Sequence, residues 1–186
     1  MHVKFEMSKE EPLMDQLQQR IAALLPRDSI GRRDLLPVLS DRALSGEIAK
    51  KLAAPFAGKA EVVVAPEALG WLLGEKIAQE LDLPLVPLRK GEKLPYASED
   101  LYRVAFMDYS GHRKSLETAK NAPLAGKRVL IVDEWIETGA QIMAVMALLK
   151  KFGAEVAGIA AIGANRGPRT DAWTEAGLLT CIGRDF

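Results

Sequence analysis

Short apolar runs alternate with helical patterns along most of the chain. Runs rich in apolar and β-branched residues predict strands at 61–65, 83–88, 128–132, 155–164 and 177–183. Apolar residues at helical spacing predict helices at 14–25, 41–56, 69–81 and 142–152. Pro84 and Pro87 indicate an edge strand or irregular pairing for the second strand, because proline donates no ladder hydrogen bond. Residues 89–124 are polar and have few periodic signals.

The predicted strands are mostly unbroken apolar runs, and helices separate them. This pattern is typical of an α/β fold with a mostly parallel sheet covered by helices on both faces. Ligands of such sheets bind beyond the carboxyl ends of the strands. The candidate site segments, which directly follow the strands, are 66–70, 89–95, 133–141 and 165–169.

The composition limits the class of function. A chain of 186 residues suits one domain with a full hydrophobic core, and its 25 basic residues balance 25 acidic ones. This balance gives no support for general binding to nucleic acid or membranes. The N-terminal residues lack the apolar segment of a signal peptide, and no apolar run approaches the roughly 18 residues of a membrane span. Cys181 is the only cysteine, which excludes a disulfide framework within the chain and favours a reduced, cytoplasmic setting.

The segment RVLIVDEWIETGAQ, residues 128–141, combines the features of an anion site. A predicted buried strand leads into two carboxylates, Asp133 and Glu134, and then into a glycine-containing loop at the start of a helix. Free N–H groups and the helix dipole attract anions there, although the Gly-Lys-Ser/Thr of a P-loop is absent. The acids suit sugar hydroxyls or a divalent cation. Together these features suggest a ribose 5-phosphate, with its sugar over the acids and its phosphate over the loop.

Simpler interpretations of this segment stay open. Acids are common at strand ends in any α/β protein. Thr138 and Gln141 also fit a capping box, in which side chains of the first helical turn satisfy backbone N–H groups of that turn. On spacing alone, an anion site and a capped helix are equally favoured.

The same segment resembles the phosphoribosyl-diphosphate (PRPP) motif of type I phosphoribosyltransferases, in which an apolar strand, two acids and a Thr-Gly loop follow one another. Residues 62–95 resemble the matching stretch of adenine phosphoribosyltransferases, including its Arg-Lys…Lys-Leu-Pro segment, and 33–41 resemble their N-terminal segment. The likeness covers about residues 30–165. It implies one domain over 1–186, with a mostly parallel five-stranded sheet flanked by helices. It also implies a small hood, formed by the N-terminal segment with or without the C-terminal one, and a mobile loop within 96–124.

The resemblance implies transfer of ribose 5-phosphate from PRPP to a nitrogenous base in purine salvage, with release of diphosphate. It makes Asp133 and Glu134 the catalytic pair, which would hold the ribose hydroxyls. Mg²⁺ is expected as a cofactor bound mainly through PRPP, with no metal site on the protein itself, and a homodimer is expected. The expected substrate-binding residues are Glu67, Ala68, Leu69, Gly70, Arg89, Lys90 and Lys93 near the diphosphate, and Trp135, Glu137, Thr138, Gly139, Ala140 and Gln141 near the ribose and phosphate.

The chain departs from the adenine-specific pattern at positions expected to be functional. Arg32 stands where an aromatic residue stacks on the base, Leu69 where an Arg is usual, and Ala105 where a Glu assists proton transfer. Ala140 and Gln141 also differ, the latter from a hydroxyl residue. A non-catalytic regulator that senses PRPP or a nucleotide is therefore the alternative function.

Three further questions concern single side chains. Gln141 could reach the phosphate or close the capping box. Trp135 could wall the ribose pocket or anchor the loop. The expected mobile loop carries basic residues that could close over the diphosphate or serve a different acceptor, namely His112, Arg113 and Lys114. A single histidine in a loop is more often solvated than catalytic.

Overall fold

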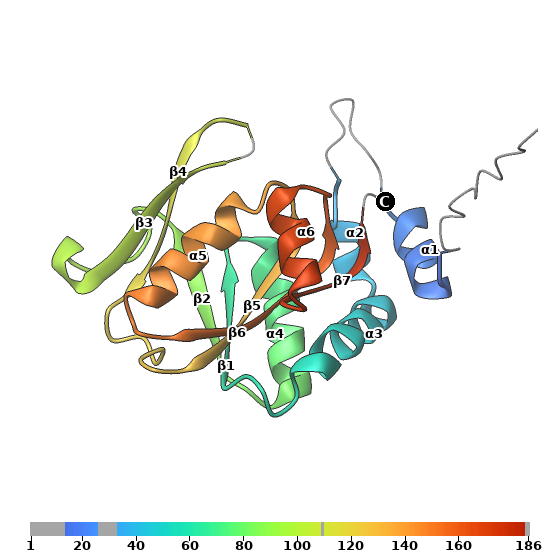
Figure 1. Ribbon diagram of the computed structural model, residues 1–186, viewed down its shortest axis with the longest axis horizontal. Coiled ribbons are helices and arrows are strands. Elements are labelled where there is room, and N and C mark those ends of the chain that lie inside the picture. Colours follow the sequence, from blue (N-terminus) through green and yellow to red (C-terminus); the bar gives the residue numbers. More distant parts are fainter. Residues whose placement is uncertain (1–13, 26–32, 109, 185–186) are drawn as a thin grey trace, which may run out of the picture.

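A seven-stranded sheet forms the centre of the computed structural model, which describes residues 14–25, 33–108 and 110–184 (Figure 1). The strand order is β3-β4-β2-β1-β5-β6-β7. The strands are β1 (Val62–Pro66), β2 (Leu85–Lys90), β3 (Leu101–Met107), β4 (Arg113–Ala119), β5 (Arg128–Ile136), β6 (Glu155–Ala164) and β7 (Leu179–Arg184). The helices are α1 (Gln16–Ala23), α2 (Leu36–Ser40), α3 (Arg42–Ala53), α4 (Leu69–Leu81), α5 (Ala140–Lys150) and α6 (Pro168–Glu175), with 3-10 turns η1 (Ala54–Phe56) and η2 (Ser98–Asp100).

The predicted five-stranded parallel sheet is confirmed as the core of this larger sheet. Strands β2, β1, β5, β6 and β7 pair in parallel, each with its neighbour. Strands β3 and β4 add an antiparallel hairpin at one edge, beside β2. The predicted count of five strands is therefore too low by the two strands of this hairpin, which lie within the polar segment 89–124.

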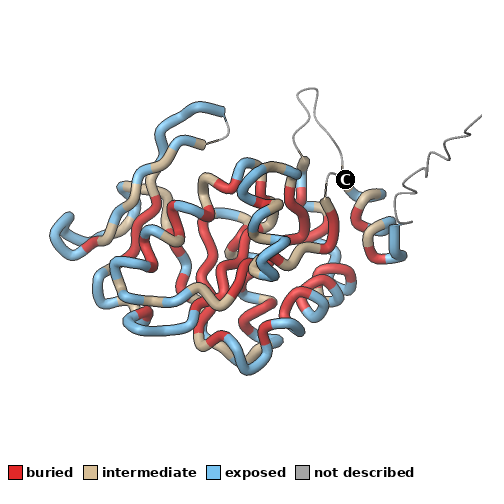
Figure 2. The backbone as a smooth tube through the Cα atoms, viewed as in Figure 1, coloured by how far each residue is buried: buried red, intermediate tan, exposed pale blue. Residues whose placement is uncertain are grey.

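The hairpin was missed because only one of its faces is apolar. Tyr102, Val104 and Phe106 of β3 pack against the core that contains α5, whereas Arg103 and Met107 alternate with them. Met107 is 54% exposed, so the apolar positions stand two apart rather than in a run. Figure 2 shows the same contrast, with the central strands buried and much of the hairpin exposed.

Strand β2 lies inside the sheet but is paired on both sides over only part of its length. Residues Leu85–Leu88 pair with β1, and Arg89 and Lys90 pair with β4. Pro87 falls in the part that pairs with β1 alone, where its missing N–H costs no hydrogen bond to a second strand. The predicted irregular pairing is thus confirmed, whereas the edge position is wrong.

Helices cover both faces of the parallel strands, as expected. Strand β5 alternates between them: Leu130 and Val132 face the cluster that includes α3 and α4, and Val129 and Ile131 face the cluster that includes α5. The four predicted helices are confirmed as α1, α3 with η1, α4 and α5. The short helices α2 and α6 were not predicted; in α6 only Thr170 is buried, so no apolar stripe marks it.

The N-terminal helix packs beside the last strand. Gln18 of α1 donates from Nε2 to the carbonyl oxygen of Ile182, 2.6 Å away. The role of the N-terminal segment as a hood and the mobility of 96–124 stay predictions. Within the described ranges, no helix combines the length and apolar character that crossing a bilayer requires.

Two glycines inside helices offer a matched test of how closely α4 packs on the sheet. A Cβ at Gly74 would lie 2.8 Å from the Cβ of Ala65, whereas in the described chain one at Gly46 of α3 meets no contact within 4 Å. Gly46→Ala should stabilise the protein by about 0.5–1 kcal/mol, because alanine is the better helix former. Gly74→Ala should instead destabilise it by about 1–3 kcal/mol through overpacking. Urea unfolding measures both, and similar stabilisation by the two would contradict this packing.

Candidate active site

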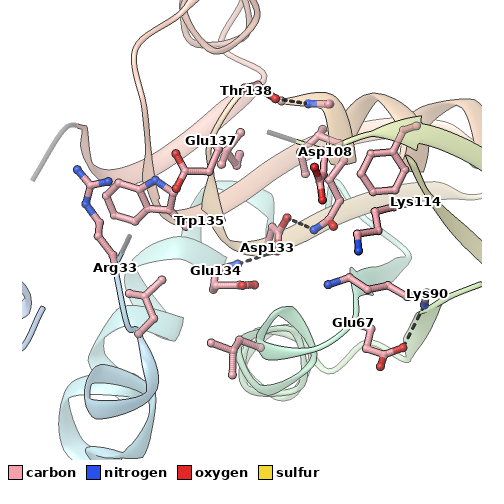
Figure 3. A pocket seen from close by; sticks show the side chains of 18 residues that line it. Arg33, Glu67, Lys90, Asp108, Lys114, Asp133, Glu134, Trp135, Glu137 and Thr138 are labelled. Atoms are coloured by element: carbon pink, nitrogen blue, oxygen red, sulfur yellow. Dashed lines mark hydrogen bonds between the residues drawn. The ribbon is translucent and has the colours of Figure 1, made fainter. Parts of the chain in front are cut away.

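A pocket of about 270 Å³ opens at the carboxyl ends of the parallel strands, and Figure 3 shows its lining. Most of the expected site residues meet in it. Those that line it are Glu67, Leu69, Lys90, Asp133, Glu134, Trp135, Glu137, Thr138, Gly139, Ala140 and Gln141. Outside the lining are Ala68, Gly70, Arg89 and Lys93.

The two acids at the end of β5 differ in their surroundings. Asp133 is only 2% exposed, and Glu134 is half-buried. Oδ1 of Asp133 accepts the N–H of Glu134 at 3.0 Å, and Oδ2 accepts Nε2 of Gln141 at 2.8 Å. Burial and then the neighbouring charge of Glu134 raise the pKa of Asp133 well above its usual range, while the amide of Gln141 opposes this rise. Ionisation of Asp133 therefore costs free energy of folding, and the hydrogen bonds from the N–H of Glu134 and the amide of Gln141 compensate part of that cost.

The loop after these acids turns directly into α5. Gly139 has φ 75°, and a Cβ there would lie 2.8 Å from the ring of Trp173, so both conformation and space favour glycine. The side-chain amide of Gln141 bonds to Asp133, so the capping-box interpretation is wrong. The N-cap residue Gly139 makes no side-chain cap, and Oγ1 of Thr138 accepts the N–H of Ala140 at a long 3.4 Å. The N-terminus of α5 therefore faces the pocket with the character of an anion site.

The basic loop after β2 is held by Glu67. Its carboxylate accepts the backbone N–H of Lys90 at 3.0 Å and Nζ of Lys93 at 2.6 Å, and Nε of Arg89 lies 3.2 Å from it. Lys93, above all, holds the pKa of Glu67 below its usual value. Of the three expected cations, only Lys90 lines the pocket; Arg89 and Lys93 are engaged by Glu67 instead.

A second carboxylate, Glu117 of β4, supports the same loop from the hairpin. It is completely buried, and Oε1 accepts the N–H groups of Lys93 at 3.0 Å and Leu94 at 3.2 Å. Arg103 donates from Nε to its other oxygen at 2.9 Å. Burial favours the neutral form of Glu117, but these donors prevail and lower its pKa. The sequence analysis missed Glu117, because its partners become apparent only once the hairpin forms.

The segment between β1 and α4 reaches the acid pair through a glycine. A Cβ on Gly70 would lie 3.2 Å from Oδ1 of Asp133 and 3.5 Å from Oε2 of Glu134, so α4 begins directly against both acids. The peptide bond between Glu67 and Ala68 is cis. Leu69 contributes an apolar surface to the pocket where the adenine-specific pattern has a cation.

Trp135 both lines the pocket and is anchored. A Cβ on Gly163 of β6 would lie 2.0 Å from its ring, so the indole rests on that strand. Its Nε1 donates to Oδ1 of Asn165 at 2.9 Å, and the guanidinium of Arg33 lies 4.2 Å from its ring centroid. Trp135 is therefore an anchor of the loop that also lines the pocket, and a contact with ribose stays a prediction.

Several lining residues were not among the expected site residues. They are Arg33, Leu35, Phe106, Asp108, Lys114, Ile136 and Ile142. Arg33 and Leu35 lie in the segment 33–41, and its resemblance to the family was the feature of the sequence that could have identified them as site residues. Phe106, Asp108 and Lys114 come from the unforeseen hairpin; Lys114 lines the pocket, whereas His112 and Arg113 do not. Arg32 lies outside the described residues.

The pocket's chemistry fits Mg²⁺ carried by a substrate. Its acidic side chains, such as Glu134, Glu137 and Asp108, offer the oxygen ligands that this ion prefers. Across the part of the chain that the structure describes, no three Asp, Glu, His or Cys side chains gather as a metal site.

Comparison with known proteins agrees with this geometry. The Phosphoribosyl transferase domain family matches residues 41–174. The adenine phosphoribosyltransferase of Methanococcus maripaludis is 34% identical over 142 residues, which cover 75% of this chain and 80% of that protein. The enzyme of the same name from Myxococcus xanthus is 37% identical over 134 residues, 72% of this chain and 71% of that protein. A crystal structure of adenine phosphoribosyltransferase from Thermoanaerobacter pseudethanolicus matches with a TM-score of 0.77 at 28% identity, covering 89% of this chain and 98% of that one.

The buried Asp133 predicts a pH-dependent stability. Because its pKa is higher in the folded than in the unfolded state, ionisation destabilises the fold increasingly as pH rises through the folded-state pKa. Asp133→Asn should therefore gain free energy of unfolding over the native protein as pH rises from acid to neutral. Each kcal/mol moves the melting temperature by about 2–4 °C in a chain of this size. Thermal unfolding across pH measures the gain.

The exposed Asp100 provides the matched control. Asp100→Asn makes the same chemical change without relieving a buried charge, so its melting temperature should follow that of the native protein at every pH. A gain for Asp133→Asn that stays constant with pH would contradict the raised pKa.

Proposed function

The chain belongs to the phosphoribosyltransferase family, and we propose that it transfers the phosphoribosyl group of PRPP to a purine base in nucleotide salvage. The observation that carries the proposal is the meeting of three groups in one pocket: the acids at the end of β5, the N-terminus of α5, and Lys90 with Lys114. A sugar that carries a phosphate at one end and a diphosphate at the other needs these three environments together.

We assign each part of PRPP to one of these environments. The 5-phosphate would accept hydrogen bonds from the N–H groups of 138–141, where the dipole of α5 adds attraction. The ribose hydroxyls would donate to Glu134, which is half-buried and lines the pocket, with Asp133 behind it. The diphosphate would lie toward Lys90 and Lys114.

Glu67 changes the expected roles of the basic loop. Its carboxylate already pairs with Nζ of Lys93 and lies 3.2 Å from Nε of Arg89, so it offsets part of the positive charge that these two residues offer to a diphosphate. Lys90 and Lys114 are therefore the first cations to meet the leaving group. Glu67 would contribute mainly by shaping the loop through the N–H of Lys90.

The reaction requires no nucleophile from the protein. A ring nitrogen of the base attacks C1 of the ribose, the bond from C1 to the diphosphate oxygen breaks, and the leaving diphosphate takes the electron pair. The carboxylates of Asp133 and Glu134 would stabilise the positive charge that develops on the sugar. Mg²⁺ bound with PRPP would neutralise charge on the diphosphate. The enclosed pocket would orient the reactants and exclude water.

The acceptor and the setting of the enzyme complete the proposal. The relatives reported above are named for adenine, and a purine is the acceptor proposed here. Ala105 supplies no carboxylate for proton transfer at the base, so that task must fall to another group or to water. We further propose a homodimer in the cytoplasm, which the family resemblance and the single cysteine support.

Turnover on a panel of bases tests the transferase directly. Incubation with Mg²⁺ and PRPP should release diphosphate with at least one of adenine, guanine, hypoxanthine and xanthine, and far less with uracil. Diphosphate release and nucleotide formation are measured together, so that hydrolysis of PRPP is distinguished from transfer. Tight PRPP binding without turnover on any base would instead favour the PRPP-sensing regulator.

Binding of PRPP tests the assignment of the acid pair. The double variant Asp133→Asn/Glu134→Gln should bind PRPP at least about tenfold more weakly in calorimetry with Mg²⁺, because hydrogen bonds to charged groups are worth roughly 1.5–3 kcal/mol. Asp100→Asn serves again as the charge-matched control and should bind PRPP as the native protein does. Equal affinity of the double variant and the native protein for PRPP would contradict the assignment of the acid pair to the ribose hydroxyls.

A further inference from the structure

Asn165, at the end of β6, uses its side-chain amide to join three residues of the pocket wall. Its Oδ1 accepts Nε1 of Trp135 at 2.9 Å and lies 3.4 Å from Nη1 of Arg33. Its Nδ2 donates to Oε2 of Glu137. Asn165 itself does not line the pocket, but all three partners do.

The backbone of Asn165 is held just as firmly. Its N–H donates to the carbonyl oxygen of Ile136 at 2.8 Å, and its own carbonyl oxygen accepts Oγ1 of Thr170 at 2.6 Å and Nη2 of Arg184 at 3.3 Å. These bonds connect β6 with β5, α6 and β7. The amide is therefore held at a fixed point, and its partners come from two other segments, Trp135 and Glu137 from the end of β5 and its loop and Arg33 from the N-terminal segment.

The three partners occupy one end of the pocket. Figure 3 shows Arg33 and Trp135 on one side of Asp133 and Glu134, and Lys90 and Lys114 on the other. Displacement at C1 requires the attacking nitrogen to approach from the face of the ribose opposite to the leaving diphosphate. If the diphosphate lies toward the lysines, the base must enter beside Arg33, Trp135 and Glu137.

We propose that Asn165 is a positioning residue that sets base specificity by holding Arg33, Trp135 and Glu137 in one arrangement around the acceptor. The inference rests on the proposed function and deepens it. A guanidinium only donates hydrogen bonds and a carboxylate only accepts them. The wall thus selects a planar heterocycle whose edge presents an acceptor and an N–H donor, as purines do.

An asparagine is required because the position must both accept and donate. The indole N–H and the guanidinium of Arg33 need an acceptor, whereas the carboxylate of Glu137 needs a donor. Asn165→Asp keeps the acceptor but places a second carboxylate against Glu137. Asn165→Ala removes both functions. Asn165→Asp therefore disturbs mainly the contact with Glu137, whereas Asn165→Ala also removes the contacts with Trp135 and Arg33.

Steady-state kinetics on the full chain test the proposal, with PRPP affinity measured separately by calorimetry. Asn165→Ala should raise KM for the preferred base at least about tenfold, as expected for loss of oriented hydrogen bonds, and reduce discrimination among bases. Its Kd for PRPP should stay within about twofold of the native value, since the phosphate would be held by backbone N–H groups and Lys90 and Lys114 lie on the other side of the acid pair. Asn165→Asp should raise the base KM as well, through repulsion of Glu137.

Asn121 supplies the matched control, because it lies exposed in the turn between β4 and β5 and does not line the pocket. Asn121→Ala and Asn121→Asp should leave base KM, PRPP affinity and base preference unchanged. Trp135→Phe is a second route if Asn165→Ala folds poorly: it keeps an aromatic ring, removes the N–H that Asn165 accepts, and should also raise base KM with PRPP affinity retained.

The outcomes separate this inference from the proposed function. A base KM and base preference that stay native in Asn165→Ala would overturn the inference, as would equal losses of base and PRPP affinity. If the native protein turns over no base, the proposed function fails, and calorimetric Kd values for bases in the presence of PRPP replace KM. Weaker base binding by the Asn165 variants would then still support the inference, and unchanged or absent base binding would overturn it.

Discussion

A buried carboxylate at the end of the central strand is the constraint on which the site depends. Asp133 is almost fully enclosed, and it accepts the N–H of Glu134 and the side-chain amide of Gln141 at close range. Its neighbour Glu134 makes ionisation harder still. Burial of this carboxylate lowers the stability of the fold at the place where a sugar with developing positive charge would bind. Active sites commonly reduce the stability of a protein in this way. Gly70 lets the backbone of α4 begin directly against both acids.

The positive charge of the site is controlled by carboxylates in a comparable way. Glu67 and Glu117 approach the basic loop from opposite directions, one from the segment after β1 and the other from the hairpin. The single carboxylate of Glu67 pairs with two cations, Arg89 and Lys93, and offsets part of their charge, and Glu117 accepts N–H groups of the loop backbone. A diphosphate that enters this region therefore meets Lys90 and Lys114 as its available cations, within a loop whose shape is already set. The arrangement favours orientation of the leaving group over a large excess of positive charge.

Two side-chain amides support the end of β5 and its loop from different elements. Gln141 of α5, which stands where the adenine-specific pattern has a hydroxyl residue, donates to the buried Asp133. Asn165, which directly follows β6, bonds to Trp135 near the end of β5 and to Glu137 in the loop. The departure at Gln141 therefore has a structural role beside the acid pair.

The sequence by itself determined the parallel core, because unbroken apolar strands and helical periodicity are local signals that each segment carries alone. It also located the acid pair, the glycine loop and Lys90, since residues that follow parallel strands must meet at one edge of the sheet. The tertiary structure alone decided the rest. The β3–β4 hairpin, with Phe106, Asp108 and Lys114, has only one apolar face and forms by pairing across the sheet. By its spacing Gln141 fits a helix cap, but its partner in the structure is Asp133, which is buried eight residues earlier. Glu117 and Asn165 act through contacts between distant segments. Which residues become partners depends on how the layers of the fold pack, and the spacing of residues along the chain does not contain that information.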